Sequence, residues 1–197
     1  MQDVATVEEI KTAKTLTSSR SKIFLETRAY LRQSLSTLFD LDPLKIPINA
    51  QPGEPPSLPS GMGNISLSHC KDAIIIVWHK NKIGIDIERT DRDFNYLKFA
   101  EKYFFHTNKS IHDNYLTKNK ILNQWCATEA AIKWDHGKLA KDINHWQFFE
   151  KPKELIHKKK NIHLNYSQIN FHHWTIALAH EEKTSFNHEI ICCSKNF

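Results

Sequence analysis

The stretch KIGIDIERT, residues 82–90, places two carboxylates on one side of an expected strand. Side chains alternate between the two faces of a strand, so Asp86 and Glu88 share a face with Gly84, while the other face carries only isoleucines. Two like charges side by side repel each other, and burying an unpaired carboxylate costs several kcal/mol. The spacing therefore indicates a positively charged partner for this face.

A second acidic position occurs in the expected helix over residues 120–134. On a helical wheel, Glu129 and Lys133 fall within the apolar stripe of this helix, one turn apart. The stripe is made by Leu122, Trp125, Cys126 and Ile132. An exposed Glu–Lys pair at this spacing is ordinary on a helix surface, but these two positions point toward the interior or into a cleft.

Asp86, Glu88 and Glu129 together offer three hard oxygen ligands, the kind that Mg²⁺ binds together with waters and substrate phosphates. Lys133 would then lie beside the phosphates. Two simpler interpretations stay open: a solvent-facing strand with ordinary acids, and a buried ion pair between Glu129 and Lys133. The hypothesis requires the strand and the helix, far apart in the chain, to meet.

The remaining pattern favours an α+β fold. Helical spacing covers residues 6–39, a loop rich in proline and glycine follows over 41–63, and a second helix is expected around 96–105. Strand patterns occur in NISLS, AIIIVWH, KIGIDIE, HWQFF, NIHLNY, HHWTIALAH and NHEIICC, with a tight hairpin expected at residues 80–81. A faint echo between NISLSHCKDAIIIVWH and QINFHHWTIALAH suggests two similar halves.

Composition predicts a soluble, cytoplasmic protein. The chain has 197 residues, a formal charge of +5 and no apolar run long enough to span a bilayer, and its N-terminus lacks the apolar core of a secretory signal. Its four cysteines have no metal-binding or disulfide spacing. The lysines are scattered without a stripe of interleaved aromatic residues, which argues against a nucleic-acid-binding domain, the second alternative function considered.

The chain resembles the 4'-phosphopantetheinyl transferases, in the larger two-domain, surfactin-synthetase-activating type. GIDIE (84–88) and WCATEAAIK (125–133) match the paired signature of that family, and NISLSHC (64–70) matches an upstream element. RSKIFLETRAYLRQSL, LDPLKIPI, GEP (53–55) and WTIALAH (174–180) also fit in order. The resemblance extends from about Arg20 to His180, and the combination is specific although no single piece is.

The resemblance implies a fold of two pseudo-symmetric halves, residues 1–88 and 89–197, each a small antiparallel sheet packed with a long helix. The active site would lie in the cleft between them. The implied monomeric enzyme, a holo-[acyl-carrier-protein] synthase, moves the phosphopantetheine arm of coenzyme A onto a serine of an apo acyl or peptidyl carrier protein and releases 3',5'-ADP. Neither nucleic acid nor membrane is an expected partner.

The resemblance also assigns site residues. Asp86, Glu88 and Glu129 would bind Mg²⁺, with Glu129 also the general base, and Lys133 would stabilise or protonate the leaving phosphate. His69, with Ser68, would contact the 3'-phosphate region of coenzyme A; Arg20 and Lys22 are further candidates for that phosphate, or a solvated basic helix end.

The sequence departs from the family at two lysines. Thr128 precedes the motif glutamate, and Glu54 stands in the usual G-K-P element; the FFHTNKS segment also lacks an acidic residue that the family often carries. These departures support the alternative of a catalytically impaired relative that binds coenzyme A or a carrier without turnover. The carrier, the choice between Mg²⁺ and Mn²⁺, and the use of coenzyme A thioesters stay open.

Overall fold

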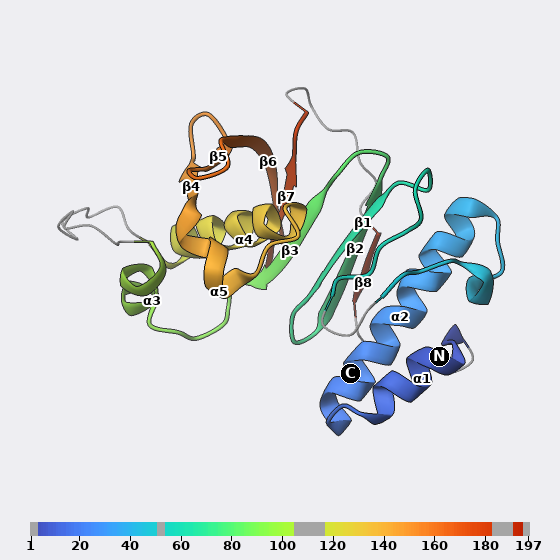
Figure 1. The fold of residues 1–197 in the computed structure, drawn as a ribbon. Helices are drawn as coiled ribbons and strands as arrows, with labels where there is room; N and C mark the ends of the chain where they lie inside the picture. Colours follow the sequence, from blue (N-terminus) through green and yellow to red (C-terminus); the bar gives the residue numbers. More distant parts are fainter. Residues whose placement is uncertain (1–3, 51–53, 105–116, 183–190, 195–197) are drawn as a thin grey trace. The chain divides into compact units, whose positions relative to one another are not determined.

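The structure is a computed structural model that describes residues 4–50, 54–104 and 117–182, and the backbone of 191–194. It is mixed α+β, as predicted, and divides into two compact units, Met1–Met62 and Gly63–Phe197 (Figure 1). The predicted boundary after residue 88 falls inside a strand of the second unit. Two pseudo-symmetric halves are not seen among the described residues and stay a prediction.

The first unit is helical. Helix α1 (Val7–Lys14) begins with a capping box in which Thr6 and Glu9 each bond the other's backbone N–H, and α2 (Ser18–Phe39) follows. The predicted helical segment is thus broken into two helices, and Thr17 is the N-cap of the second. A short 3₁₀ turn, η2 (Pro43–Lys45), interrupts the loop after α2.

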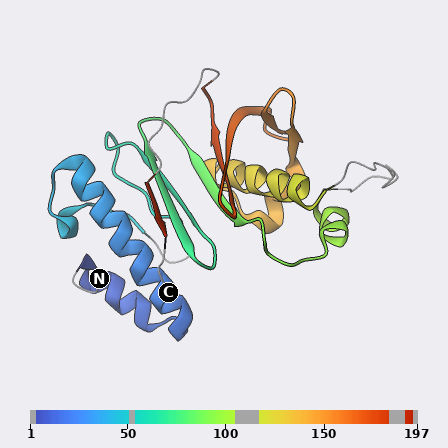
Figure 2. The same cartoon turned by 180° about the vertical axis from the view of Figure 1, so that it is seen from behind.

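The second unit contains two antiparallel sheets (Figures 1 and 2). In one, β1 (Asn64–His69) pairs with β2 (Ala73–His79), and β8 (Ile191–Ser194) lies along the other edge of β2. The other has the order β3-β7-β6-β5-β4, with β3 (Gly84–Arg89), β7 (Trp174–His180), β6 (Ile162–Phe171), β5 (Glu154–His157) and β4 (Trp146–Phe149).

The predicted hairpin at residues 80–81 is wrong. Strands β2 and β3 belong to different sheets, because β3 pairs along its length with β7 and β2 pairs with β1 and β8. Side chains of β1 still connect the sheets: the hydroxyl of Ser66 accepts a hydrogen bond of 3.1 Å from the backbone N–H of Ile85. The two segments of the internal echo do form hairpins, β1 with β2 and β6 with β7.

The helices of the second unit are α3 (Tyr96–Tyr103), α4 (Lys118–Trp134) and the short α5 (Leu139–Asp142), followed by η3 (Ile143–His145). Helix α4 packs on β3 and β7 (Figure 1). It ends at Trp134, as predicted. Beyond this residue the backbone N–H of Gly137 donates to the carbonyl of Ile132, and His136 has the left-handed backbone conformation that is common after a helix end.

The core lies on both faces of β7. Its residues Ala177 and Ala179 pack under α4, and the alternate residues Ile176 and Leu178 pack with the isoleucines of β3 and with β2. Small residues on the helix side let α4 approach closely, and large ones fill the space between the sheets. Within the described ranges, no helix has the length and apolar character that crossing a bilayer requires.

Candidate active site

Strand β3 and helix α4 meet at a glycine. A Cβ at Gly84 would lie 2.0 Å from the carbonyl oxygen of Ala130 and 2.6 Å from the backbone nitrogen of Trp134. The two backbones are therefore closer than any side chain at position 84 would permit. This approach is what brings the carboxylate face of β3 against the helix.

The three predicted acids converge. Ligand oxygens of Asp86, Glu88 and Glu129 lie within 4.8 Å of one another, with Asp86 buried and the two glutamates half-buried. The predicted alternation of β3 is confirmed, because Ile85 and Ile87 are buried in the core on the opposite face. The solvent-facing interpretation of this strand is wrong.

Lys133 pairs with the aspartate. Its Nζ lies 2.7 Å from Asp86 Oδ1, and the same oxygen accepts a 2.7 Å hydrogen bond from the hydroxyl of Ser68. Lys133 therefore forms its ion pair with Asp86 and not, as in the simpler alternative, with Glu129. Oδ2 of Asp86 is buried and has no hydrogen-bond partner among the described residues.

Glu88 has two partners that the sequence reasoning missed. Arg92 donates to Oε2 at 2.7 Å, and the indole N–H of Trp125 donates to Oε1 at 2.9 Å. Trp125 was interpreted as core, which its burial confirms, but its one polar atom serves the site. The only signal for Arg92 was a positive charge four residues after Glu88, outside any regular element.

Among the described residues, the cluster holds three carboxylates and two cations, Lys133 and Arg92. Burial and then the charge of Asp86 raise the pKa of Glu129 to about 8, even though Lys133 acts in the opposite direction. Burial and Asp86 also raise the pKa of Glu88, against the effect of Arg92. Without a metal ion, the cluster therefore holds a proton on Glu129 at neutral pH.

These features fit a hard divalent cation. The uncompensated charge, the unpartnered buried oxygen of Asp86 and the close spacing of the three carboxylates are what such an ion requires. Asp86 can offer Oδ2 while Oδ1 keeps its bonds to Lys133 and Ser68. Each of the three carboxylates therefore lies close enough to the other two to bind the same ion.

A cavity of about 450 Å³ adjoins Glu88. Its cationic side chains are Lys71, Arg89 and Arg92; His69, Cys70, Glu88 and Asp91 complete the lining. His69 is exposed at the end of β1 and faces this cavity, whereas Ser68, on the other side of the strand, is bonded to Asp86. His69 thus faces the cavity and Ser68 faces the acidic cluster, although the two were predicted to act together. Their contact with coenzyme A stays a prediction.

Cys70, also on this cavity, has a protonated thiol. Burial raises its pKa, and the sulfur lies 3.5 Å from Asp72 Oδ1. A thiolate nucleophile is therefore not indicated at this position.

Arg20 and Lys22 lie in the first two turns of α2, in the other compact unit. Both are exposed, and Lys22 Nζ is 4.0 Å from the carboxylate of Glu26. The structure does not relate the first unit to the acidic cluster. Their role in binding a phosphate stays a prediction.

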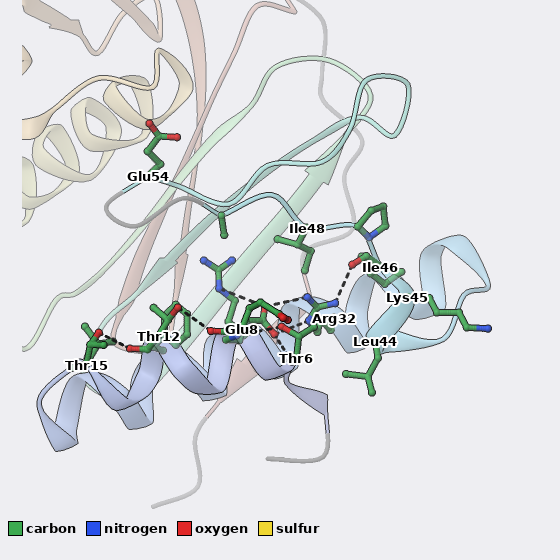
Figure 3. Close-up of a pocket in the computed structure, with 16 residues that line it drawn as sticks. Thr6, Glu8, Thr12, Thr15, Arg32, Leu44, Lys45, Ile46, Ile48 and Glu54 are labelled. Carbon is green, nitrogen blue, oxygen red and sulfur yellow. Dashed lines mark hydrogen bonds and ion pairs between the residues drawn. The ribbon is translucent and has the colours of Figure 1, made fainter.

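The structure describes the surroundings of Thr128 and Glu54, the two positions where the sequence departs from the family pattern. Thr128 is buried and donates to the carbonyl of Gln124 within α4, so this position is part of the core. Glu54 is exposed and lines a cavity of the first unit (Figure 3). Gly53 and residues 105–110, which carry other parts of the comparison with the family, lie outside the described residues.

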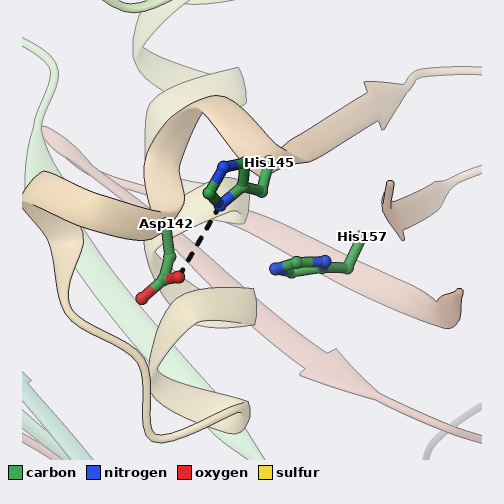
Figure 4. Close-up of side chains that lie close together, drawn as sticks. All are labelled: Asp142, His145 and His157. Atoms are coloured by element: carbon green, nitrogen blue, oxygen red, sulfur yellow. Dashed lines mark ion pairs between the residues drawn. The ribbon is translucent and has the colours of Figure 1, made fainter. Parts of the chain in front are cut away.

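A second cluster, Asp142, His145 and His157, also brings ligand atoms within 4.8 Å (Figure 4). Nδ1 of buried His157 accepts a hydrogen bond from the backbone N–H of Lys160, and burial lowers the pKa of this histidine. Neutral His157 therefore carries its proton on Nε2, which leaves no lone pair there for a metal. That Nε2–H group is itself buried and has no hydrogen-bond partner among the described residues, so the cluster is not a closed polar network, and no metal site is assigned to it.

Comparisons with known proteins add no family. The sequence matches no protein-family model and no curated protein.

The raised pKa of Glu129 predicts an unusual pH dependence of stability. Between pH 4.5, its ordinary pKa, and about 8, the folded metal-free protein binds a proton that the unfolded chain has released. The free energy of unfolding should therefore fall as pH rises through this window, by up to about 1.4 kcal/mol per pH unit. Urea denaturation in EDTA measures it. Glu129→Gln should remove this part of the slope; identical slopes in the two proteins would contradict the assignment.

Proposed function

We propose that this protein is a Mg²⁺-dependent 4'-phosphopantetheinyl transferase that modifies a serine of a carrier protein. The observation that carries the proposal is the convergence of Asp86, Glu88 and Glu129 beside the ammonium group of Lys133. Residues from two motifs 40 positions apart meet where the resemblance requires one site. A purely structural origin of the motifs would not require an uncompensated carboxylate.

The cavity beside Glu88 is suited to phosphates. Lys71 is exposed on its wall, and Arg92 bridges the cavity and the acidic cluster through its bond to Glu88. A pyrophosphate bound there would have cationic side chains on one side and the carboxylates on the other. A divalent cation held by Asp86, Glu88 and Glu129 supplies the charge neutralisation that lets the two anionic groups approach each other.

Glu129 is the candidate general base. In the reaction, the oxygen of the carrier serine forms a bond to the β-phosphorus of coenzyme A, and the bond from that phosphorus to the bridging oxygen of 3',5'-ADP breaks. The serine proton passes to the carboxylate of Glu129, directly or through water. For this role the glutamate must be ionised, which requires the excess negative charge of the cluster to be compensated.

Lys133 is the candidate for stabilising the leaving group. Its ammonium is held by Asp86 at 2.7 Å, and its side chain is partly exposed, so it can reach a phosphate without leaving the cluster. It can neutralise or protonate the departing oxygen of 3',5'-ADP. The formal charge of +5 would favour encounter with carrier domains that are acidic.

A transfer assay tests the proposal. The full chain, Mg²⁺, coenzyme A and apo carrier domains of the fatty-acid, polyketide and nonribosomal-peptide types should give a carrier mass increased by one phosphopantetheine, with EDTA preventing the gain. The alternative, an impaired relative, predicts coenzyme A binding without transfer, and Thr128 and Glu54 are its support. If neither transfer nor coenzyme A binding is found, the proposal fails.

A further inference from the structure

The first unit contains a cavity of about 620 Å³ between α1, α2 and the segment after η2 (Figure 3). This size is within the range of small-molecule sites. Its walls combine apolar side chains, among them Leu16, Phe24, Leu44, Ile46 and Ile48, with threonines and charged groups. All of its lining residues belong to positions 6–54, so the cavity is a property of this unit alone.

A buried ion pair closes one end of this cavity. Arg32 donates to both carboxylate oxygens of Glu9, from Nε at 2.9 Å and from Nη2 at 3.2 Å, and its Nη1 donates to the carbonyls of Pro43 and Ile46 at 3.0 Å. Glu9 also accepts from the backbone N–H of Thr6. The carboxylate of Glu9 and the guanidinium of Arg32 therefore find their hydrogen-bond partners in each other and in the backbone.

Arg28, one turn before Arg32 on α2, has no hydrogen-bonded carboxylate among the described residues. The residue is only 7% exposed and lines the cavity, yet its Nε is 3.9 Å from Glu9, too far for a hydrogen bond. Its NH1 group has no partner among the described residues, and its other neighbour is the ring of Phe24 at 5.1 Å. Burial, and after it the charge of Arg32, lowers the pKa of Arg28 against the effect of Glu9.

Among the described residues that line the cavity, the buried charged groups are Arg28, Arg32 and Glu9, so two cations have one carboxylate between them. The other charged residues of the lining, Glu8, Lys45 and Glu54, are exposed. A ligand with one negative charge would complete the pairing of these buried groups, because Arg28 has no hydrogen-bonded carboxylate of its own. The apolar part of the walls suits a hydrocarbon body.

We propose that this cavity binds a small monocarboxylate with an apolar chain, whose carboxylate is held by the guanidinium of Arg28. A guanidinium presents its N–H groups as a planar fork that matches a carboxylate. The site is argued from the first unit alone and needs no metal, so binding to it can be measured whether or not the protein transfers phosphopantetheine.

The test uses the full chain in EDTA with octanoate labelled with ¹³C at the carboxyl carbon. Octanoate should bind saturably by NMR titration and raise the melting temperature, and Arg28→Met should weaken binding at least about tenfold. Arg28→Met should also melt higher than wild type without ligand, because it removes a buried charge that lacks full compensation. Lys14→Met, which replaces an exposed cation on α1 outside the cavity lining, is the control and should bind as wild type does.

Three outcomes would overturn the inference. Binding of octanoate that is unchanged in Arg28→Met would show that the arginine does not hold the carboxylate. Octanamide binding as tightly as octanoate would show that charge is not recognised. Stabilisation by inorganic phosphate equal to that by octanoate would show a general anion site without a role for the apolar walls.

Discussion

Replacing Glu129 with glutamine is expected to lower phosphopantetheinyl transfer by at least about a hundredfold while the protein stays folded. The amide has the same shape but cannot accept the serine proton, and it contributes one charge less to the metal site. The measurement is the rate of carrier modification at saturating coenzyme A and Mg²⁺, with circular dichroism as the check of the fold.

Glu101 offers a matched control for this experiment. It is an exposed glutamate on α3, outside the acidic cluster, so Glu101→Gln should transfer at the wild-type rate. Because Glu129→Gln also removes a carboxylate destabilised by its neighbours, the metal-free variant should be more stable than wild type above about pH 8. A variant that keeps the full transfer rate would rule out Glu129 as the base and leave it, at most, a dispensable ligand.

Gly84→Ala is expected to have the largest effect on stability, a loss of more than about 4 kcal/mol or failure to fold. The new methyl group would lie 2.0 Å from Ala130 O and 2.6 Å from Trp134 N, both backbone atoms that cannot rotate away. Relief requires α4 to move off β3, which would also separate Glu129 and Lys133 from Asp86. Soluble yield and urea denaturation measure the effect.

Gly61→Ala separates this clash from the general cost of replacing a glycine. A methyl group at Gly61 would meet nothing within 4 Å, and only its left-handed φ of +90° opposes the substitution, at a cost of about 1–2 kcal/mol. A Gly84→Ala protein no less stable than Gly61→Ala would contradict the close approach of β3 and α4.

The convergence of the acids could be predicted because two local patterns each placed charge on a face that had to be buried. Period two put Asp86 and Glu88 together on a strand, and the helical wheel put Glu129 in an apolar stripe. The α+β class followed from the same patterns. A strand and a helix with apolar faces can pack together in few ways, so the positions available to the carboxylates were limited.

Other features depend on partners that local sequence does not specify. The pairing of β3 with β7 instead of β2 joins residues about 90 positions apart, and a short connection between β2 and β3 looks the same in either case. Strand β5 has only four residues and no alternation long enough to detect. The choice of Lys133 for Asp86, and of Arg92 for Glu88, is decided by side-chain reach within the folded site.

The hydroxyls of β1 determine which residues that strand can tolerate. Ser66 holds the N–H of Ile85 and Ser68 holds the carboxylate of Asp86, so two serines on alternate positions bind β3 where no backbone ladder joins the two strands. Alanine would fit the space at either position and valine would suit a strand, yet both lack the oxygen. Hydrogen-bonding capacity, more than volume or strand propensity, therefore limits substitution at positions 66 and 68.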